Sequence, residues 1–505
     1  MSRQTRTLPA ALLAAVTVLS VPALYATNTH NPPVISQTCA ACHGSEGQGG
    51  GIFPRIAGQS VEFLQQQLRF FRSGERPNGM MQAVTRNLSD ADITKLADYF
   101  SMLKPPFEKP DGALPVEEKV RGQQLVTAGD WQHGVPACIR CHGPDLGGVA
   151  PSIPALTGQS RPYMVAALRL FQHANGQAGY FPRVLMSHVS AGLSDADIQT
   201  VTTYIASLKR GEKPQAARPL HDAAYKFAAQ SPDNFTPPPE SAIPTGPDGD
   251  GIWRGLLIFE NTQHYADQYV GNALNCSSCH LDRGRLAEST PMWAAYVTYP
   301  KYRSKNHQVN TLQERIQDCF RFSMNGRPPS ADSPELKSLV SYFHWLATGL
   351  PVGLTPKGAG YPELLASPQP PDIQRGAAVY EASCAMCHGD TGKGREARRE
   401  QLFPPLWGPK SFNWGAGMER ISTAAAFIKA NMPYGAGNTL SDQQAWDVAA
   451  FVVSHPRPQD PRFDGSVETT RNKFHNHDSY YGRMINGHLL GAPEEQHNSK
   501  RRGLK

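Results

Sequence analysis

Apolar residues in this chain of 505 residues fall into short stretches with helical spacing, and several of these begin just after a serine. The clearest follows Ser89, where apolar side chains recur every three or four residues from Ile93 to Phe100 and form one helix face. The Ser89 hydroxyl can accept a hydrogen bond from the first turn, and Asp92 can reach back to the Ser89 backbone. The pattern predicts a capped amphipathic helix that starts at this serine.

Closely related patterns occur at three other places. The segment Leu88–Ile93 reads Leu-Ser-Asp-Ala-Asp-Ile and recurs unchanged as Leu193–Ile198, which indicates an internal repeat in the N-terminal part of the chain. Similar helices are predicted after Ser441 and after Ser333, where Pro334 takes a first-turn position that proline tolerates.

Other helical stretches begin near an Arg-Gly pair. The pairs are Arg121-Gly122, Arg254-Gly255 and Arg375-Gly376. Because glycine has no Cβ, it allows another helix to approach closely. We therefore expect helix–helix contact at each pair.

The longest apolar stretch lies near the N-terminus, at Leu8–Leu24, and follows Arg3 and Arg6. Its length and the small residues near Ala26 are typical of a secretory signal peptide, which we place at 1–26. An uncleaved membrane anchor is the alternative for this stretch. No later apolar run approaches about 18 residues, so we expect the mature protein to be soluble.

Eight of the nine cysteines lie in four segments of the form Cys-x-x-Cys-His. The segments are Cys39-Ala-Ala-Cys42-His43, Cys138-Ile-Arg-Cys141-His142, Cys276-Ser-Ser-Cys279-His280 and Cys384-Ala-Met-Cys387-His388. This is the attachment signature of haem c, in which both thiols bond the porphyrin and the histidine binds the iron. One such segment is also compatible with a zinc site or a thioredoxin-like redox pair, but four that share no cysteine favour haem. The sequence therefore predicts four covalently bound haem c groups, with His43, His142, His280 and His388 as axial ligands.

The expected fold is mostly α, with four helical haem modules of the class I cytochrome c type arranged as two diheme halves. Proline-rich stretches separate the modules. The predicted divisions are module 1 at 27–105, module 2 at 115–209, a linker at 210–248, module 3 at 249–350, module 4 at 370–456 and an irregular tail at 457–505. We expect the linker to be an extended tether, because its composition offers little to bury.

Charge and compartment narrow the function further. The formal net charge of +6 becomes less positive when the signal peptide is removed, and haem propionates add negative charge, so no nucleic-acid partner is expected. Haem c is attached on the outer side of the bacterial inner membrane, which predicts a periplasmic protein. That compartment permits disulfides, but haem takes every cysteine except Cys319.

The second axial ligand of each iron decides its chemistry. In the repeat, Met81 precedes Leu88 by the same interval as Met186 precedes Leu193, whereas the neighbouring Met80 has no counterpart. We therefore predict Met81 and Met186 as ligands of the first two irons. In module 4, the Asn-Met-Pro-Tyr-Gly segment is typical of a class I ligand loop and favours Met432, with Met418 as the alternative.

Module 3 has no Met-Pro loop but contains the ninth cysteine, Cys319. Five cationic residues lie near it in the sequence, namely Arg303, Lys305, Arg315, Arg321 and Arg327. A buried free cysteine and a solvent-facing group of cations are the ordinary explanations of the two features taken separately. Together they suggest a Cys319 thiolate on the third iron beside a pocket for anions, since iron and positive charge both favour thiolate.

The segment Arg315–Gly326 reads Arg-Ile-x-x-Cys-Phe-x-x-Ser-Met-Asn-Gly and resembles the thiosulfate dehydrogenase family, with a likeness that spans about 245–460. Members of that family are diheme cytochromes whose active-site haem has His and Cys ligands, and they couple two thiosulfates to tetrathionate or run the reverse. The N-terminal half, about 30–210, resembles a diheme electron carrier of the c-four type. The chain thus looks like a fusion of carrier and dehydrogenase.

The resemblance also implies roles for individual residues. These are Cys319 as iron ligand opposite His280, Arg315 and Ser323 as substrate-binding residues, and Arg303 or Lys305 as further ones. Some relatives carry a lysine beside the methionine ligand of their second haem, and the two can exchange. Here Asn431 precedes Met432, so we expect no such exchange.

The implied substrate suits the chemistry of this segment. Thiosulfate is a dianion, and bringing two together needs cations such as arginine, whose planar fork matches sulfonate oxygens. Cys319 either stays an iron ligand or leaves iron to carry a sulfur-bonded intermediate. Thiolate lowers and methionine raises the haem potential, so electrons should run from the third haem through the fourth to the first pair and on to a soluble or membrane-bound redox partner.

Two other functions compete with this one. A plain multihaem electron carrier would have no substrate pocket and could dispense with Cys319. Another sulfur-transforming haem enzyme would need a partner that carries its substrate. Turnover with free thiosulfate separates all three.

Overall fold

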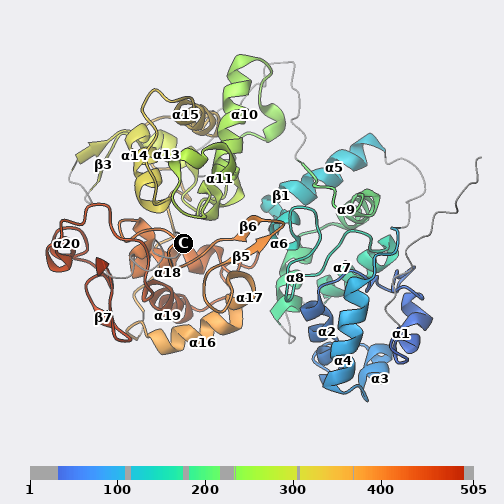
Figure 1. The fold of residues 1–505 in the computed structure, drawn as a ribbon. Coiled ribbons are helices and arrows are strands. Elements are labelled where there is room, and N and C mark those ends of the chain that lie inside the picture. The colour runs from blue at the N-terminus through green and yellow to red at the C-terminus, as the bar shows by residue number, and fades with distance from the viewer. Residues whose placement is uncertain are drawn as a thin grey trace, which may run out of the picture.

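A computed structural model describes residues 32–107, 115–173, 181–215, 233, 235–303, 308–367 and 369–493. Helices dominate this part of the chain, and the strands form only antiparallel two-stranded ribbons, which confirms the mostly α fold class (Figure 1). The signal peptide predicted at 1–26 lies outside the described residues. No described helix combines the length and the apolar character needed to cross a membrane.

The N-terminal half contains the elements of modules 1 and 2. Module 1 has α1 (Ser36–His43), α2 (Val61–Ser73), α3 (Gly79–Thr85) and α4 (Asp90–Met102). Module 2 has α5 (Val116–Thr127), β1 (Gly129–Asp130), β2 (Val135–Pro136), α6 (Ile139–His142), α7 (Arg161–His173), α8 (Phe181–Ala191) and α9 (Asp195–Ser207).

The C-terminal half contains modules 3 and 4 and the tail. Module 3 has α10 (Pro247–Glu260), α11 (Thr262–Tyr265), α12 (Leu281–Gly284), α13 (Met292–Thr298), β3 (Lys301–Arg303), β4 (Gln308–Asn310), α14 (Leu312–Asp318), a π-helix (Cys319–Ser323) and α15 (Pro334–Leu346). Module 4 and the tail have α16 (Ile373–Ser383), α17 (Ala385–His388), β5 (Arg395–Ala397), β6 (Glu400–Phe403), α18 (Ile421–Asn431), α19 (Asp442–Val453), α20 (Val467–Phe474), β7 (Met484–Ile485) and β8 (His488–Leu489). The module boundaries drawn from the sequence stay predictions.

The last helix of each module, its closing helix, starts with a serine cap. These helices are α4, α9, α15 and α19, and all four begin where the sequence predicts. The hydroxyls of Ser89, Ser194, Ser333 and Ser441 each accept a hydrogen bond from the backbone three residues later. In α4 and α9 the aspartate at the third position completes the capping box. These caps satisfy backbone donors that a helix start otherwise leaves without a partner.

Each Arg-Gly helix packs against the closing helix of its own module, in the pairs α5–α9, α10–α15 and α16–α19. A Cβ added to Gly255 would lie 2.1 Å from the Ser338 carbonyl oxygen, and one on Gly376 would lie 2.0 Å from that of Asp447. The expected close contact is therefore present, and no larger residue fits there. The neighbouring arginine also binds the closing helix, as Arg375 does through Asp447 at 2.8 Å.

Modules 1 and 2 meet through two matching glutamine contacts. The Gln159 side chain accepts from the Arg55 backbone N–H at 2.9 Å and donates to the Arg55 carbonyl at 2.8 Å. The Gln59 side chain makes the same two bonds to the backbone of Ala155, at 2.8 and 3.0 Å. Each module thus binds the backbone of the other through one glutamine side chain. These reciprocal contacts relate the two repeated modules by a pseudo-twofold axis.

The last part of the linker predicted at 210–248 is not an extended tether, because its side chains make buried contacts. Ile243 is fully buried in the core of module 3. The Phe235 ring packs on Trp293 with a centroid separation of 5.2 Å, and Glu240 forms an ion pair with Arg283. Residues from 235 onward therefore belong to module 3, because their apolar side chains complete its core.

The tail is also more ordered than predicted, at least over residues 457–493. It contains α20 and the β7–β8 ribbon, and Tyr481 is fully buried against Trp414. Asp478 caps α18, because its carboxylate accepts from the Ser422 backbone N–H at 2.6 Å. Figure 1 shows this segment beside α18 and α19. The prediction of an irregular tail is wrong for these residues.

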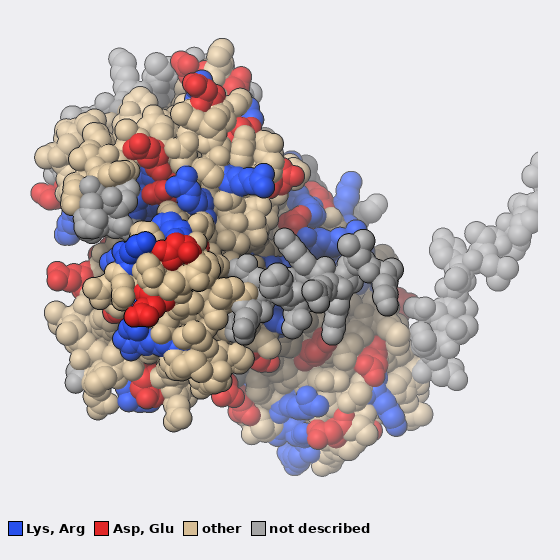
Figure 2. Space-filling view, turned by 60° about the vertical axis from the view of Figure 1, so that its left-hand side comes forward, with Lys and Arg blue, Asp and Glu red and all other residues tan. Residues whose placement is uncertain are grey.

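Charged residues are interspersed on the face drawn in Figure 2, where Lys and Arg lie beside Asp and Glu. Ion pairs between the modules follow the same pattern. Arg398 of the β5–β6 ribbon, for example, binds Asp145 of module 2 at 2.7 Å. Such neutralised contacts join the two halves of the chain.

Candidate active site

All four histidines of the Cys-x-x-Cys-His segments are held in the same way. Each donates a hydrogen bond from Nδ1 to a backbone carbonyl 10 to 16 residues later. The pairs are His43 with Pro54 (2.8 Å), His142 with Pro154 (2.8 Å), His280 with Thr290 (2.8 Å) and His388 with Pro404 (2.9 Å). This bond fixes the tautomer that leaves Nε2 free to bind a metal, as metal-ligating histidines typically require.

The protonation state of these histidines also suits an iron ligand. Burial lowers the pKa of all four, and it lowers that of His280 to about 4, with a further contribution from the Arg315 charge. The imidazoles are therefore neutral at neutral pH, which is the form that binds a metal. With two cysteines beside each histidine, the residues fit covalently attached haem c at all four segments.

Cys319 lies at the point where α14 passes into a π-helix of five residues, Cys319–Ser323. Thr311 and Glu314 form a capping box that starts α14. One turn before the cysteine, Arg315 donates a hydrogen bond from Nη1 to the Cys319 sulfur at 3.0 Å. This contact places a fixed cation directly on the cysteine sulfur.

The charge of Cys319 affects the pKa values of the two cysteines in the third haem segment. Burial raises the pKa of both Cys276 and Cys279, and the charge of Cys319 raises each further. The same charge is the main cause that raises the pKa of Arg315, against the opposing effect of burial. The Arg315 charge also lowers the pKa of His280, after the larger effect of burial.

Two of the other described cations, Arg303 and Arg321, pair with a carboxylate. Arg303 binds Asp318 at 2.8 Å, and Arg321 lies 3.6 Å from the same carboxylate. Arg327 is exposed, and Lys305 lies outside the described residues. Among the described cations, the hydrogen bond to the Cys319 sulfur is made by Arg315, whereas Arg303 and Arg321 pair with Asp318.

Ser323 ends the π-helix and is partly buried. Its carbonyl accepts a hydrogen bond from the Asn272 side chain at 2.7 Å. The Asn413 side chain holds the same element from module 4, by donating to the Arg321 carbonyl at 3.0 Å. Two asparagines from distant parts of the chain thus fix the backbone that carries Cys319. Neither was singled out by sequence reasoning.

Tyr361 is a further residue of this site that the sequence did not indicate. It lies in the stretch between modules 3 and 4, which reads as linker. Burial raises the pKa of Tyr361, the charges of Cys279 and Cys319 raise it further, and Arg315 opposes them. The phenol is therefore a neutral hydrogen-bonding group near the sulfur and the arginine. Its ring packs edge-on against Phe427 of α18, with centroids 5.7 Å apart.

The candidate methionine ligands differ in exposure. Met80 is 57% exposed, whereas Met81 is partly buried. Thr85 donates to the Met81 carbonyl at 2.8 Å, and Ser190 makes the matching bond to Met186 at 2.7 Å, so the two positions are equivalent in the repeat. The assignment of Met81 and Met186 as iron ligands stays a prediction. Met80 is less suited to bind a buried iron, because its side chain is largely exposed.

Family models match most of this architecture. The model "SoxA/TsdA, cytochrome c domain" matches residues 262–352 and "Cytochrome c" matches 120–209. The model "Cytochrome C oxidase, cbb3-type, subunit III" matches 32–100 and 371–452. A covalently bound haem c is thus indicated both by these cytochrome domains and by the Cys-x-x-Cys-His segments.

Similar proteins include both a dehydrogenase and its acceptor. The thiosulfate dehydrogenase of Thiomonas intermedia (strain K12) is 55% identical over 258 residues, which are 51% of this chain and 82% of that protein. The chain belongs to the thiosulfate dehydrogenase family. The thiosulfate dehydrogenase electron acceptor of the same organism is 40% identical over 180 residues, which are 35% of this chain and 80% of that protein.

A solved member of the family has a similar overall architecture. The thiosulfate dehydrogenase (TsdBA) from Marichromatium purpuratum is 40% identical to this chain and superimposes with a TM-score of 0.77. The match covers 90% of this chain and 95% of that one. Both halves of the chain, and not only its dehydrogenase-like part, thus have counterparts in this family.

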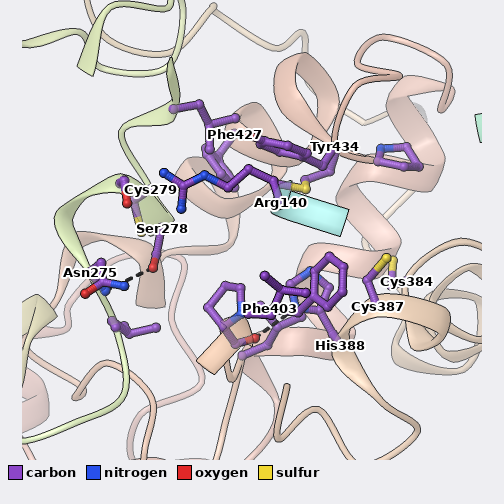
Figure 3. Close-up of a pocket in the computed structure, with 18 of the residues that line it drawn as sticks. Arg140, Asn275, Ser278, Cys279, Cys384, Cys387, His388, Phe403, Phe427 and Tyr434 are labelled. Carbon is purple, nitrogen blue, oxygen red and sulfur yellow. Dashed lines mark hydrogen bonds between the residues drawn. The ribbon is translucent and has the colours of Figure 1, made fainter. Parts of the chain in front are cut away.

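Three of the haem segments meet at one large pocket, shown in Figure 3. Cys384, Cys387 and His388 of module 4 line it, together with Cys279 of module 3 and Cys141 of module 2. Cys141 and Cys387 also pack on the same apolar cluster, which includes Phe403 of β6. Cysteines from the Cys-x-x-Cys-His segments of three different modules therefore line one pocket.

The candidate sixth ligands of module 4 lie at the same pocket. Met432 and Met418 both line it, so the arrangement admits the predicted ligand and its alternative. Asn431, beside Met432, points its side chain elsewhere, because its amide donates to the Glu288 and Phe427 carbonyls, each at 3.1 Å. An asparagine held in this way fits the expectation that it does not exchange with the methionine.

A partly buried ion network joins module 2 to module 3 at the edge of the pocket. Arg140, inside the second haem segment, binds Glu260, which also accepts from Arg283 at 2.8 Å. Arg283 in turn binds Glu240 at 2.5 Å and donates to the Thr127 carbonyl at 3.1 Å. Figure 3 shows the Arg140 side chain extending between Cys279 and Tyr434. Sequence reasoning missed this network, because its members are far apart in the chain.

Proposed function

We propose that this chain oxidises thiosulfate and joins two thiosulfates into tetrathionate at a haem bound by His280 and Cys319. Membership of the thiosulfate dehydrogenase family supports the substrate. The observation that carries the site assignment is the 3.0 Å hydrogen bond from Arg315 to the Cys319 sulfur, next to the third haem segment.

The reaction balances without a proton. Two thiosulfate dianions lose one electron each, and a sulfur–sulfur bond forms between their terminal sulfurs to give the tetrathionate dianion. A haem c held by Cys276, Cys279 and His280 would supply a one-electron acceptor for this reaction. The remaining demand on the protein is electrostatic, because two dianions in a partly buried site repel each other strongly.

The described residues meet that demand in part. Arg315 is a fixed cation whose guanidinium can pair with sulfonate oxygens through two parallel hydrogen bonds. Tyr361 offers a neutral hydroxyl near the same place, so it can donate to a sulfonate without adding negative charge. Ser323 and, outside the described residues, Lys305 remain proposed substrate contacts. Arg303 is better assigned to positioning, because it holds Asp318 next to Cys319.

We assign one haem to each of the four Cys-x-x-Cys-His segments, with methionine at Met81, Met186 and Met432 as the second axial ligand outside module 3. Methionine raises and thiolate lowers the haem potential, so electrons should leave module 3 for module 4. The shared pocket and the packing of Cys141 near Cys387 support a continuation into module 2. A redox protein then accepts the electrons, as the similarity to an electron-acceptor protein suggests.

The signal peptide and the haem type support a periplasmic location for the mature protein. Turnover of the purified chain with thiosulfate and ferricyanide tests the function directly. We expect two ferricyanides to be reduced for each tetrathionate formed, and the intact mass to include four haems. A protein that carries haem but reduces no ferricyanide with thiosulfate would be an electron carrier instead.

A further inference from the structure

We propose that Glu419, His475 and His477 form a binding site for a divalent transition metal of the zinc type, separate from the haems. One nitrogen or oxygen atom from each of the three residues lies within 4.8 Å of the other two. The three residues come from two segments, since Glu419 precedes α18 and both histidines follow α20. Imidazole nitrogen and carboxylate oxygen are a typical ligand set for zinc.

His475 is oriented as a metal ligand rather than as a simple hydrogen-bond donor. Its Nε2 donates to Asp460 at 3.0 Å, and its ring stacks on Tyr481 with centroids 4.2 Å apart. Its side chain is 1% exposed, yet Nδ1 has no hydrogen-bond partner among the described residues. A buried polar atom without a partner is rare in proteins, and a carboxylate–histidine pair with one free nitrogen is the usual arrangement behind a bound metal.

The free nitrogen faces the carboxylate that would share the metal. Nδ1 of His475 lies 3.4 Å from Oε1 of Glu419, outside hydrogen-bond geometry. Two ligand atoms on a tetrahedral zinc are about 3.4 Å apart when each bond is about 2.0–2.1 Å. The observed separation thus matches a pair of ligands better than a donor and an acceptor.

The remaining contacts hold the site in place. Ser479 donates its hydroxyl to the other oxygen of Glu419, and His477 Nε2 lies 2.5 Å from Oε1. Arg462 binds Asp460 through two nitrogens, at 2.9 and 2.6 Å. A metal would take the lone pair of His477 in place of this short contact, so three protein ligands and one open position result.

An ion-pair network is the competing explanation. In that case a protonated His475 would donate from both nitrogens, to Asp460 and to Glu419. The second of these bonds is missing, because Nδ1 of His475 and Oε1 of Glu419, 3.4 Å apart, do not meet hydrogen-bond geometry. The metal accounts for the free nitrogen, whereas the network does not.

The site would join the tail to the wall of the haem pocket. Glu419 directly follows Met418, which lines that pocket. Arg462, which orients Asp460, also lies over the ring of Phe322 in the π-helix, 5.0 Å from its centroid. A metal here would have a structural role, since it would fix the tail against module 4 and the Cys319 segment. Neither Met418 nor Cys319 is among its ligands.

The test measures metal in the full-length holoprotein. The tag-free protein is dialysed against a chelator, loaded with zinc chloride, desalted and analysed by mass spectrometry for zinc per chain. We expect about one zinc in the wild type and in His264→Gln, whose exposed histidine lies outside the cluster, and a loss of at least tenfold in His477→Gln and Glu419→Gln. Wild-type protein that retains no zinc, or variants that retain it fully, would overturn the proposal.

X-ray absorption at the zinc edge of the loaded wild type identifies the zinc ligands directly. This test does not depend on whether a variant folds. The expected spectrum has nitrogen and oxygen neighbours at about 2.0–2.1 Å with the outer-shell pattern of two imidazoles. A first shell that contains sulfur, or that lacks imidazole, would place the zinc elsewhere and overturn the proposal. The measurement is independent of thiosulfate turnover.

Discussion

At the scale of single residues, one arginine–cysteine contact combines the two requirements of the proposed site. Arg315 and Cys319 are four residues apart, so helical geometry brings them to the same face. The guanidinium contacts the cysteine sulfur and remains the described cation best placed to meet an anionic substrate. The nearby Arg303 and Arg321 instead share Asp318, so most of the charge that the sequence shows near Cys319 is neutralised.

Arg315→Ala should therefore lower catalytic efficiency while all four haems remain attached. Loss of one charge-assisted contact in a partly buried site costs about 1.5–3 kcal/mol, which corresponds to roughly 10- to 100-fold in kcat/KM with thiosulfate. Arg321→Ala is the charge-matched control, because that side chain is half exposed and should change kcat/KM less than about twofold. Equal losses in both variants would mean that overall charge, not contact with the site, is what matters.

A second residue-scale prediction concerns the first haem. Met81→Ala should abolish the weak near-infrared sulfur–iron band of that haem, because the repeat pairs Met81 with Met186. Met80→Ala should leave the band intact, since Met80 is more than half exposed. Absorption spectra of the oxidised variants check this. A band lost in Met80→Ala but kept in Met81→Ala would reverse the assignment.

At the scale of elements, each of modules 2 to 4 depends on one close helix pair. The α10–α15 pair in module 3 has its tightest point at Gly255, where the α15 backbone leaves no space for a Cβ. The same helix contains Gly251, around which a Cβ would meet no atom within 4 Å. The same helix thus contains one glycine at a close helix contact, Gly255, and one away from any contact, Gly251, which serves as its control.

Gly255→Ala should destabilise the protein by about 1–3 kcal/mol, because a packed backbone must move. Gly251→Ala should stabilise it by about 0.5–1 kcal/mol, because alanine favours the helix and nothing obstructs it. Denaturant unfolding followed by circular dichroism gives the comparison. If both variants change stability in the same direction and by the same amount, the close contact is not what requires glycine at 255.

The contrast between sequence and structure is clearest among these elements. The four serine caps follow from local chemistry, and the Arg-Gly contacts from the size of glycine, so both are readable from the sequence. The π-helix at Cys319 and the buried linker residue Ile243 depend on packing against distant segments. Tyr361 and the His475 cluster come together only in three dimensions, since no spacing rule relates Glu419 to residues some sixty positions later.

At the scale of the whole molecule, the two halves are joined by ion pairs, one shared pocket and a small apolar cluster of Val149, Ile153 and Phe403, whereas most of each core lies within its own half. The large core cluster of module 3 contains no residue of module 1 or 2. Contacts between halves include Arg140 with Glu260 and Arg398 with Asp145. A dehydrogenase that matches only about half of this chain is consistent with that separation.

A C-terminal fragment should therefore fold, attach two haems and oxidise thiosulfate with ferricyanide, but its starting point matters. A fragment from residue 233 keeps Ile243 and Glu240, whereas one from residue 245 removes both. Burial of Ile243 alone contributes about 1.5–3 kcal/mol, so the shorter fragment should melt at a lower temperature. Thermal unfolding of the two fragments compares them, and equal midpoints would show that the preceding segment adds nothing to module 3.

The central claim is that Cys319 is the second axial ligand of the third haem. The most direct measurement is the low-temperature electron paramagnetic resonance spectrum of the oxidised full-length protein, recorded for the wild type and for Cys319→Gly. The wild type should show a His/thiolate low-spin signal beside those of His/Met haems, and the variant should keep all four haems but lose that signal, with thiosulfate turnover lower by orders of magnitude. Identical spectra and full turnover in the variant would contradict the claim and make Cys319 an ordinary partly buried cysteine.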